Sequence, residues 1–291
     1  MTPWARATLA LKLLALDPAG LGGLWLRARS GPVRERFVAA LDGLPLPRRK
    51  IHPAIADEQL YGGVDLSATL GSGRVVWQAG LLARPAALVL PMAERCTPGL
   101  AARLGAALDT GTGHCLIALD EGAEPEEALP RGLADRLALH VDLDAVSVSQ
   151  TAPLAATDLP VRNPLRPLPA APDSALSDLA ALALRLGIDS LRAPSLALRA
   201  AKAHAMLEGR TEVATEDLAA AVELVLAPRA TQVPAEEQQE DDAPEPPPEK
   251  TPEPEDQPQE DADSAQDELR LPEEILLEAA AAALPRDLLE K

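Results

Sequence analysis

Aromatic residues are scarce in this sequence. They make up 2% of its 291 residues, so Ala, Leu and Val must fill any hydrophobic core. Metal-binding side chains are also few. The four histidines and the two cysteines, Cys96 and Cys115, show no zinc-ligand spacing. We therefore predict no metal site in this chain.

Two further absences concern the compartment. No apolar run reaches the ~20 residues that a membrane-spanning helix needs. No small-residue cleavage site follows the apolar N-terminal stretch. Isolated cysteines in a chain of this length are typical of a reducing environment. These features predict a cytoplasmic protein without a membrane span.

Positive charge is almost missing from one segment. The net charge is −18, and the stretch between Thr231 and Leu269 holds fifteen acids and a single base, Lys250. The rest of the chain is nearly balanced, so it lacks the basic face that nucleic-acid binding requires. With its eight prolines, segment 231–268 is predicted to be a disordered acidic linker. A solvated spacer and a docking segment for a basic partner both remain open.

Four continuous apolar runs predict buried strands, and they lie at 22–26, 87–92, 115–119 and 137–143. Continuous rather than alternating runs are typical of a parallel sheet covered on both faces. Helix-like segments separate them, one of which has Pro98 in its first turn and Gly111 just past its end. This alternation predicts an α/β core over residues 1–149.

A proline-rich connector at 150–172 follows this core. Three amphipathic segments come next, at 174–187, 194–209 and 215–228, with helix-start and helix-stop residues at their ends. They predict a small all-helical lid domain over residues 173–230.

The stretch "RARSGPVR" (27–34) lies between the first predicted strand and a helix-like run. This is the setting of a P-loop, G-x-x-x-x-G-K-[ST], in which backbone N–H groups and a lysine hold phosphates. Here Arg27 and Pro32 occupy the glycine positions, Val33 the lysine position and Arg34 the Ser/Thr position. The segment is either a degenerate P-loop or an ordinary turn.

Longer segments resemble a known family. "YGGVDLSATLGSGRVVWQAGLLAR" (61–84), "EPEEALPRGLADRL" (124–137) and "GIDSLRAPSLALRAAKAHAMLEGRTEVATEDLAAAVELVL" (187–226) are similar to the AAA+ subunits of magnesium chelatase. The acidic linker followed by "LPEE" (271–274) resembles the D-type subunits, so residues 269–291 would begin an integrin-I-type region. A MoxR-like AAA+ chaperone component unrelated to tetrapyrroles is the alternative.

The resemblance assigns roles to individual positions. Segment 27–34 becomes a Walker A loop that has lost every fixed residue. The Walker B pair falls on Ala93 and Glu94, and the sensor-1 asparagine falls on Glu124. Ala93 cannot hold Mg²⁺, and a carboxylate at Glu124 would repel a γ-phosphate. The resemblance therefore implies a degenerate nucleotide site without cofactor.

Two arginines keep their family positions. Arg136 matches the arginine finger and Arg192 matches the sensor-2 arginine. Either they act on a neighbouring subunit's nucleotide, or they make only inter-subunit salt bridges. Asp142 and Asp144 lie near a strand end and could suggest a metal site, but such carboxylates are common loop residues.

The family inserts Mg²⁺ into protoporphyrin IX at the expense of ATP in chlorophyll and bacteriochlorophyll biosynthesis. The resemblance implies a non-hydrolysing platform subunit that forms an oligomeric ring. Its expected partners are the I subunit, an ATPase that binds Mg²⁺ and ATP, and the porphyrin-binding H subunit.

Overall fold

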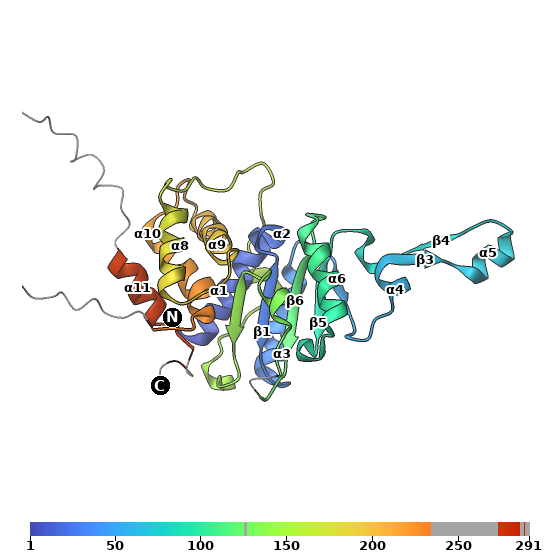
Figure 1. The fold of residues 1–291 in the computed structure, drawn as a ribbon, viewed down its shortest axis with the longest axis horizontal. Helices are drawn as coiled ribbons and strands as arrows, with labels where there is room; N and C mark the ends of the chain where they lie inside the picture. The colour runs from blue at the N-terminus through green and yellow to red at the C-terminus, as the bar shows by residue number, and fades with distance from the viewer. Residues whose placement is uncertain (125–126, 234–272, 286–287, 289–291) are drawn as a thin grey trace, which may run out of the picture.

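A parallel five-stranded sheet forms the core of the computed structural model, which describes residues 1–124, 127–233, 273–285 and 288. The strand order is β2-β5-β6-β1-β7 (Figure 1). The strands are β1 (Gly23–Arg27), β2 (Arg48–Lys50), β5 (Ala87–Pro91), β6 (Cys115–Asp120) and β7 (Leu139–Asp142). The predicted α/β class and the four apolar strands are confirmed. The sequence does not predict β2, whose three residues are all charged.

Each face of the sheet buries its own core. Along β6, the side chains of Cys115, Ile117 and Leu119 join a core with α1 (Pro3–Leu16) and α3 (Pro32–Ala40). Leu116 and Ala118 point to the other face, against α6 (Pro98–Asp109) and α7 (Arg131–Ala134). The two-residue period of a strand separates the two sets. This covered sheet explains why the strand sequences are continuously apolar.

The three predicted lid helices are confirmed. They are α8 (Ala175–Arg185), α9 (Ala193–Leu207) and α10 (Thr215–Ala221), which a π-helical stretch, Val222–Leu226, continues. The lid adjoins the core through contacts of α9 with α1 and with the short helix α2 (Pro18–Leu21). The buried Asp17 carboxylate joins the two parts, because it accepts hydrogen bonds from Arg199 and from Arg162 (3.4 Å).

An arm, residues 61–80, projects from the body between β2 and β5 (Figure 1). It contains α5 (Leu66–Ser72) between the antiparallel strands β3 (Gly62–Val64) and β4 (Trp77–Ala79), and α4 (Asp57–Tyr61) leads into it. Gly62 has a φ of 95°, and a Cβ there would lie 2.4 Å from the Gln78 carbonyl oxygen. Glycine is therefore required where the two strands meet.

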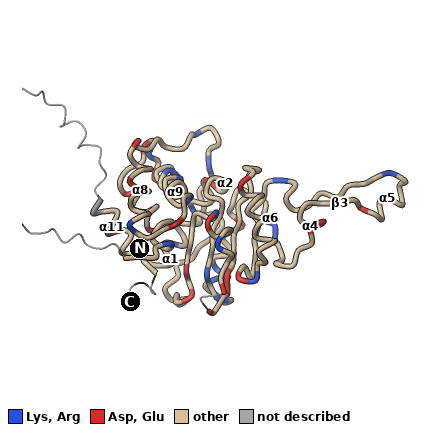
Figure 2. Tube along the Cα trace, viewed as in Figure 1, with Lys and Arg blue, Asp and Glu red and all other residues tan. Residues whose placement is uncertain are grey.

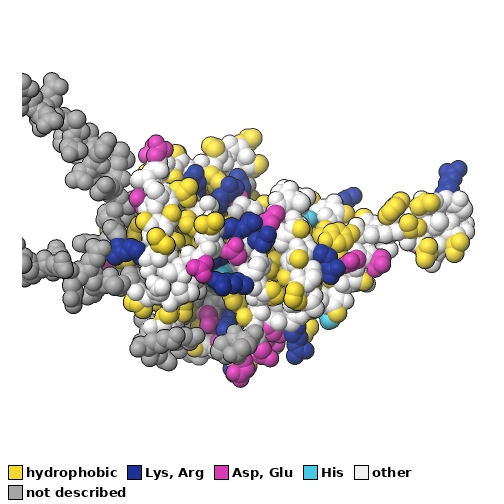
Figure 3. All heavy atoms as spheres, in the orientation of Figure 1, with side chains coloured by type: hydrophobic (Ala, Val, Ile, Leu, Met, Phe, Trp, Pro, Cys, Tyr) yellow, Lys and Arg dark blue, Asp and Glu magenta, His cyan; other side chains and the backbone are white. Residues whose placement is uncertain are grey.

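The arm is unusually apolar for a projecting element. Figure 2 shows few charges along it, and Figure 3 shows hydrophobic side chains on its surface. Leu70 is 83% exposed and Trp77 is 72% exposed. The arm also holds Tyr61, so it carries two of the chain's few aromatic residues on its surface.

The acidic linker predicted at 231–268 lies almost wholly outside the described residues, which stop at 233 and resume at 273. The following helix, α11 (Glu273–Ala281), makes contacts with α10 and with the π-helical stretch. Leu276 and Ala280 are buried there. The described part of segment 269–291 therefore packs on the lid. None of the described helices has the length and apolar character needed to cross a membrane.

Candidate functional site

The carboxyl ends of the five parallel strands meet at one edge of the sheet, where α/β proteins bind ligands. We call this the carboxyl edge. Loop 27–34 follows β1 there. Residues 92–95 follow β5, and Glu121 and Gly122 follow β6. The fold therefore brings the predicted Walker A and Walker B positions together.

Loop 27–34 lacks the groups that hold phosphates. Pro32 is the first residue of α3, so this turn of backbone offers no N–H at that position. Val33 packs against the hydrophobic core instead of extending over the loop. Arg27 donates from Nη2 to the Gly122 carbonyl oxygen at 3.2 Å. The loop is thus tied to the end of β6 by its own side chain.

Arg34 and Glu94 hold the same segment from two other directions. Arg34 forms an ion pair with Glu121, and its side chain is only 11% exposed. Glu94 accepts a hydrogen bond from the Glu121 N–H at 3.1 Å. The neighbouring Ala93 is fully buried and offers no metal ligand. Together with Arg27 and Gly122, these residues form what we call the carboxyl-edge network.

Asp120 underlies this network, and the sequence analysis does not single it out. Its carboxylate is buried and accepts hydrogen bonds from the Trp25 indole N–H (2.9 Å) and from two backbone N–H groups, those of Gly122 (2.8 Å) and Leu129 (3.3 Å). These bonds fix the turn that presents Glu121. Glu124, the predicted sensor-1 position, is exposed and lies beyond the turn.

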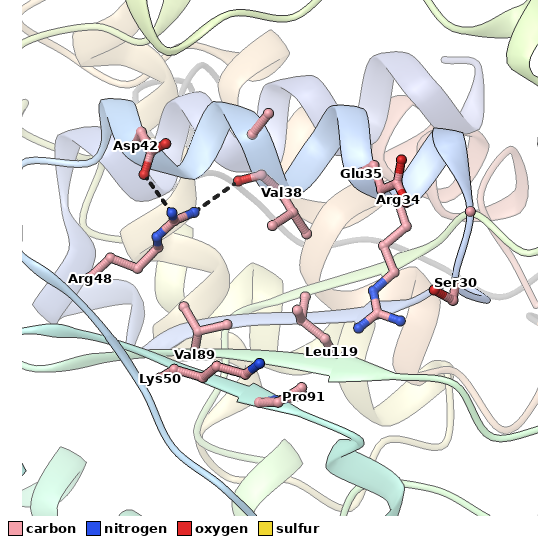
Figure 4. A pocket seen from close by; sticks show the side chains of 12 residues that line it. Ser30, Arg34, Glu35, Val38, Asp42, Arg48, Lys50, Val89, Pro91 and Leu119 are labelled. Atoms are coloured by element: carbon pink, nitrogen blue, oxygen red, sulfur yellow. Dashed lines mark hydrogen bonds and ion pairs between the residues drawn. The ribbon is translucent and has the colours of Figure 1, made fainter.

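A cavity of about 610 Å³ lies beside the network, between α3 and strands β2, β5 and β6 (Figure 4). Its walls are largely apolar. Arg34 and Lys50 extend into it from opposite sides, whereas Arg48 is held at its far end by Asp42 at 2.8 Å. The lining includes Ser30, Arg34, Val38, Lys50, Val89 and Leu119. Its volume lies within the range of small-ligand pockets.

The two aspartates at the end of β7 accept hydrogen bonds from backbone N–H groups. Asp144 accepts a hydrogen bond from the Arg29 N–H at 2.9 Å, and Asp142 accepts one from the Asp144 N–H at 2.9 Å.

Within the described ranges, no group of three potential metal ligands comes together. Burial raises the pKa of Cys96 to about 11 and that of Cys115 to about 12, so neither thiol is poised for nucleophilic chemistry.

Arg136 and Arg192 lie at the opposite, amino edge of the sheet. Arg136 precedes β7, and Asp109 ends the helix that leads toward β6, so both lie where strands begin. Asp109 accepts hydrogen bonds from Arg136 Nη2 (2.6 Å) and Nε (3.0 Å) and from Arg192 Nη1 (3.2 Å). The hydrogen bond from Arg136, together with both positive charges, lowers the pKa of Asp109. The structure therefore joins the two predicted arginines on one carboxylate.

Two contacts fix the conformation of the Arg136 side chain. It passes over Gly105 of α6, where a Cβ would lie 3.2 Å from its Nε, and its Nη1 donates to the Gly132 carbonyl oxygen at 2.6 Å. The Arg136 side chain is 25% exposed, against 48% for Arg192. Both arginines thus have partners within their own chain.

Lid residues complete this amino-edge cluster, which consists of Asp109, Asp135, Arg136, Ser190 and Arg192. Ser190 donates to Asp135, and Arg192 lies 3.7 Å from the same carboxylate. The half-buried Arg229 of the lid donates to the carbonyl oxygens of Leu137 and Ala138, which directly follow Arg136. Burial lowers the pKa of Arg229 to about 10, so it stays protonated at neutral pH.

The arrangement does not fit a magnesium nucleotide. Val33, at the predicted lysine position, is apolar and packs against the core, and Ala93, at the predicted position of the Mg²⁺ carboxylate, is buried. Arg27 and Arg34 of the loop already bind groups of the same chain. The carboxyl edge therefore offers a closed polar network with an adjoining cavity.

The comparisons with known proteins agree with the resemblance. The AAA lid domain family matches residues 176–249. The chain is 53% identical to the Magnesium-chelatase 60 kDa subunit of Cereibacter sphaeroides, in an alignment covering 99% of this chain and 51% of that protein. It is 49% identical to the 60 kDa subunit of Rhodobacter capsulatus, with 77% and 41% covered. It is 31% identical to the Magnesium-chelatase 67 kDa subunit of Chlorobaculum parvum, with 80% and 43% covered.

The fold has a counterpart among solved structures. A crystal structure of a Cytophaga hutchinsonii protein assigned as an ATPase matches with a TM-score of 0.56 and 16% identity, covering 77% of this chain and 84% of that one. This likeness concerns the fold alone. The chain spans about half the length of the curated relatives it matches. Over that half, it belongs to the family of the magnesium-chelatase 60 and 67 kDa subunits.

Proposed function

We propose that this chain is the AAA+ part of a magnesium chelatase D subunit that does not hydrolyse ATP. The enzyme complex inserts Mg²⁺ into protoporphyrin IX in chlorophyll and bacteriochlorophyll biosynthesis, in the cytoplasm. In this complex the chain is a ring-forming platform. The I subunit binds Mg²⁺ and ATP, and the H subunit binds the porphyrin.

One observation carries the non-hydrolysing role. At the carboxyl edge, Arg34 is paired with Glu121 where a phosphate-binding loop would leave its donors free. Val33 and Ala93 remove the lysine and the Mg²⁺ ligand that phosphoryl transfer needs. The chelatase names of the relatives support this assignment over a MoxR-like chaperone component.

The arginines of the amino edge support a contact role for Arg136. An arginine finger must reach a neighbour's phosphate, yet Arg136 already has Asp109 and the Gly132 carbonyl as partners. We therefore place this chain in its own ring, stacked on a ring of I subunits, with Arg136 and Arg192 maintaining the lid against the core.

The test is a pull-down with purified I subunit, with and without Mg-ATP, followed by an ATPase assay of the recovered complex. We expect the chain to retain I subunit. Hydrolysis should disappear when the I subunit carries a substitution of its own Walker A lysine, because the chain supplies no second active site. Failure to retain I subunit would contradict the platform role. Hydrolysis that persists with that I-subunit variant would contradict the non-hydrolysing role.

A further inference from the structure

The carboxyl-edge network contains a carboxylate in an unusual position. Glu121 lies directly after β6, and its side chain pairs with Arg34, the more enclosed of the two network arginines. The main chain around it is fixed, since its N–H donates to Glu94 and the next carbonyl accepts from Arg27. The fold thus aims this carboxylate at a cationic group.

A second cation lies near Arg34 on the side that faces the cavity. Figure 4 shows Arg34 and Lys50 both extending into the cavity. Within the described part of the chain, Lys50 has no ion-pair partner, whereas Arg48 is occupied by Asp42. Two cations therefore converge on a space of about 610 Å³ that Glu35 also lines, and Glu121 pairs with one of the two cations.

The cavity is large enough for a small anion, because its volume of about 610 Å³ is many times the ~30 Å³ that one water molecule occupies in the liquid. Apolar walls from Val38, Val89 and Leu119 lower the local dielectric around the enclosed Arg34 and strengthen its attraction for an anion, and the exposed Lys50 adds a second positive charge. Guanidinium and ammonium groups bind phosphate oxygens well, through directed hydrogen bonds and as a point charge respectively.

We propose that Arg34 and Lys50 form a binding site for phosphate-type oxyanions and that the Glu121 carboxylate neutralises Arg34 as an internal counter-ion. The anion competes with Glu121 for Arg34. Recognition stops at the phosphate group, since Pro32 and Val33 remove the backbone and lysine contacts of a nucleotide cradle. This inference goes beyond the proposed function, which requires only that the chain not hydrolyse ATP.

Glu121→Gln is the central variant, because it removes the charge but keeps the backbone N–H that donates to Glu94. Isothermal titration of the whole chain with pyrophosphate at low salt measures binding. We expect the variant to bind at least about tenfold more tightly than the wild type. ATP without Mg²⁺ should gain by a similar factor, because only the phosphates are recognised.

Two further variants make the result specific. Adding Arg34→Met to Glu121→Gln should abolish the gain. Glu35→Gln is the matched control: Glu35 is exposed and lines the same cavity, but no ion pair joins it to Arg34. Its gain should stay below about twofold. Thermal unfolding of each variant establishes that it is folded.

The proposal is overturned if folded Glu121→Gln binds pyrophosphate no better than the wild type, or if the gain survives Arg34→Met. An equal gain in Glu35→Gln, or a gain for ATP more than about tenfold above that for pyrophosphate, also overturns it. ATP hydrolysis by the wild-type chain alone would instead contradict the proposed function, so the two failures are distinguishable.

Discussion

The two edges of the sheet use charged residues for different connections. At the carboxyl edge, Arg27 and Arg34 join loop 27–34 to the segment after β6, so both ends of each contact belong to the core. At the amino edge, Arg192 and Arg229 cross from the lid to the core. The charged residues of the carboxyl edge connect parts of the core, and those of the amino edge connect the lid to the core.

This difference shows what holds each part in place. The carboxyl edge is held by Asp120 and the carboxyl-edge network. The lid has direct ties to the core through Asp109, Asp135 and the buried Asp17. Side-chain bonds within the chain therefore connect the lid to the core.

The largest expected effect is at the carboxyl edge. Asp120→Ala removes the acceptor of the partly buried Trp25 indole N–H and of two buried backbone N–H groups. We expect the free energy of unfolding to fall by about 3–5 kcal/mol, measured by urea denaturation. Asp120→Asn keeps an acceptor oxygen, so its free energy of unfolding should fall clearly less. A loss below about 1 kcal/mol in Asp120→Ala would show that the core does not depend on this carboxylate.

A middle-sized effect should come from His140, which lies between the two edges on β7. Burial, with a smaller contribution from the Arg229 charge, lowers its pKa well below 6.5, and its Nε2 donates to the Ala134 carbonyl oxygen at 3.1 Å. As the pH falls, the unfolded chain therefore protonates this imidazole before the folded chain does. Stability should fall as the pH drops below 6.5, by up to about 1.4 kcal/mol per pH unit.

The measurement is the free energy of unfolding between pH 7.5 and 5. His140→Gln should flatten the dependence relative to the wild type. His52→Gln, at an exposed position, should leave it unchanged. Parallel pH profiles for all three proteins would argue that His140 titrates alike in the folded and unfolded chain.

The smallest effect concerns the amino edge. Arg136→Ala removes a partly exposed ion pair with Asp109, so we expect the free energy of unfolding to fall by only about 0–1 kcal/mol. At matched occupancy, the ATPase rate of I subunit mixed with this variant should stay close to that with the wild type. Arg131→Ala, whose side chain is 86% exposed at the same edge, is the control. A true finger contributes roughly 10³–10⁵-fold in rate, so a large drop specific to Arg136→Ala would exclude the stacked arrangement.

Most of the sheet is predictable because its strands are buried on both faces and read as apolar runs. The edge strand β2 is not, since its three charged residues carry no hydrophobic signal. The arm escapes prediction for a related reason. Its glycines and exposed side chains show no burial pattern, because almost nothing packs against it.

The site is predictable only in part. The strand-turn-helix setting of "RARSGPVR" locates the loop, but Asp120 and Glu121 are single acids after an apolar strand and carry no spacing signal. Likewise, Asp109 lies 27 residues from Arg136 in sequence. Their pairing depends on α6 ending beside the segment that precedes β7, which becomes visible only when the strand order is known.

The position of the arm has a consequence for the covalent continuity of the chain. Arg74 stands exposed near the tip, so trypsin can cut there without opening the body. The cut would leave β1 and β2 on one fragment and β5, β6 and β7 on the other. Because β1 lies between β6 and β7, and β2 pairs with β5, three strand junctions would span the break. The nicked protein should persist as a non-covalent complex of two complementary pieces.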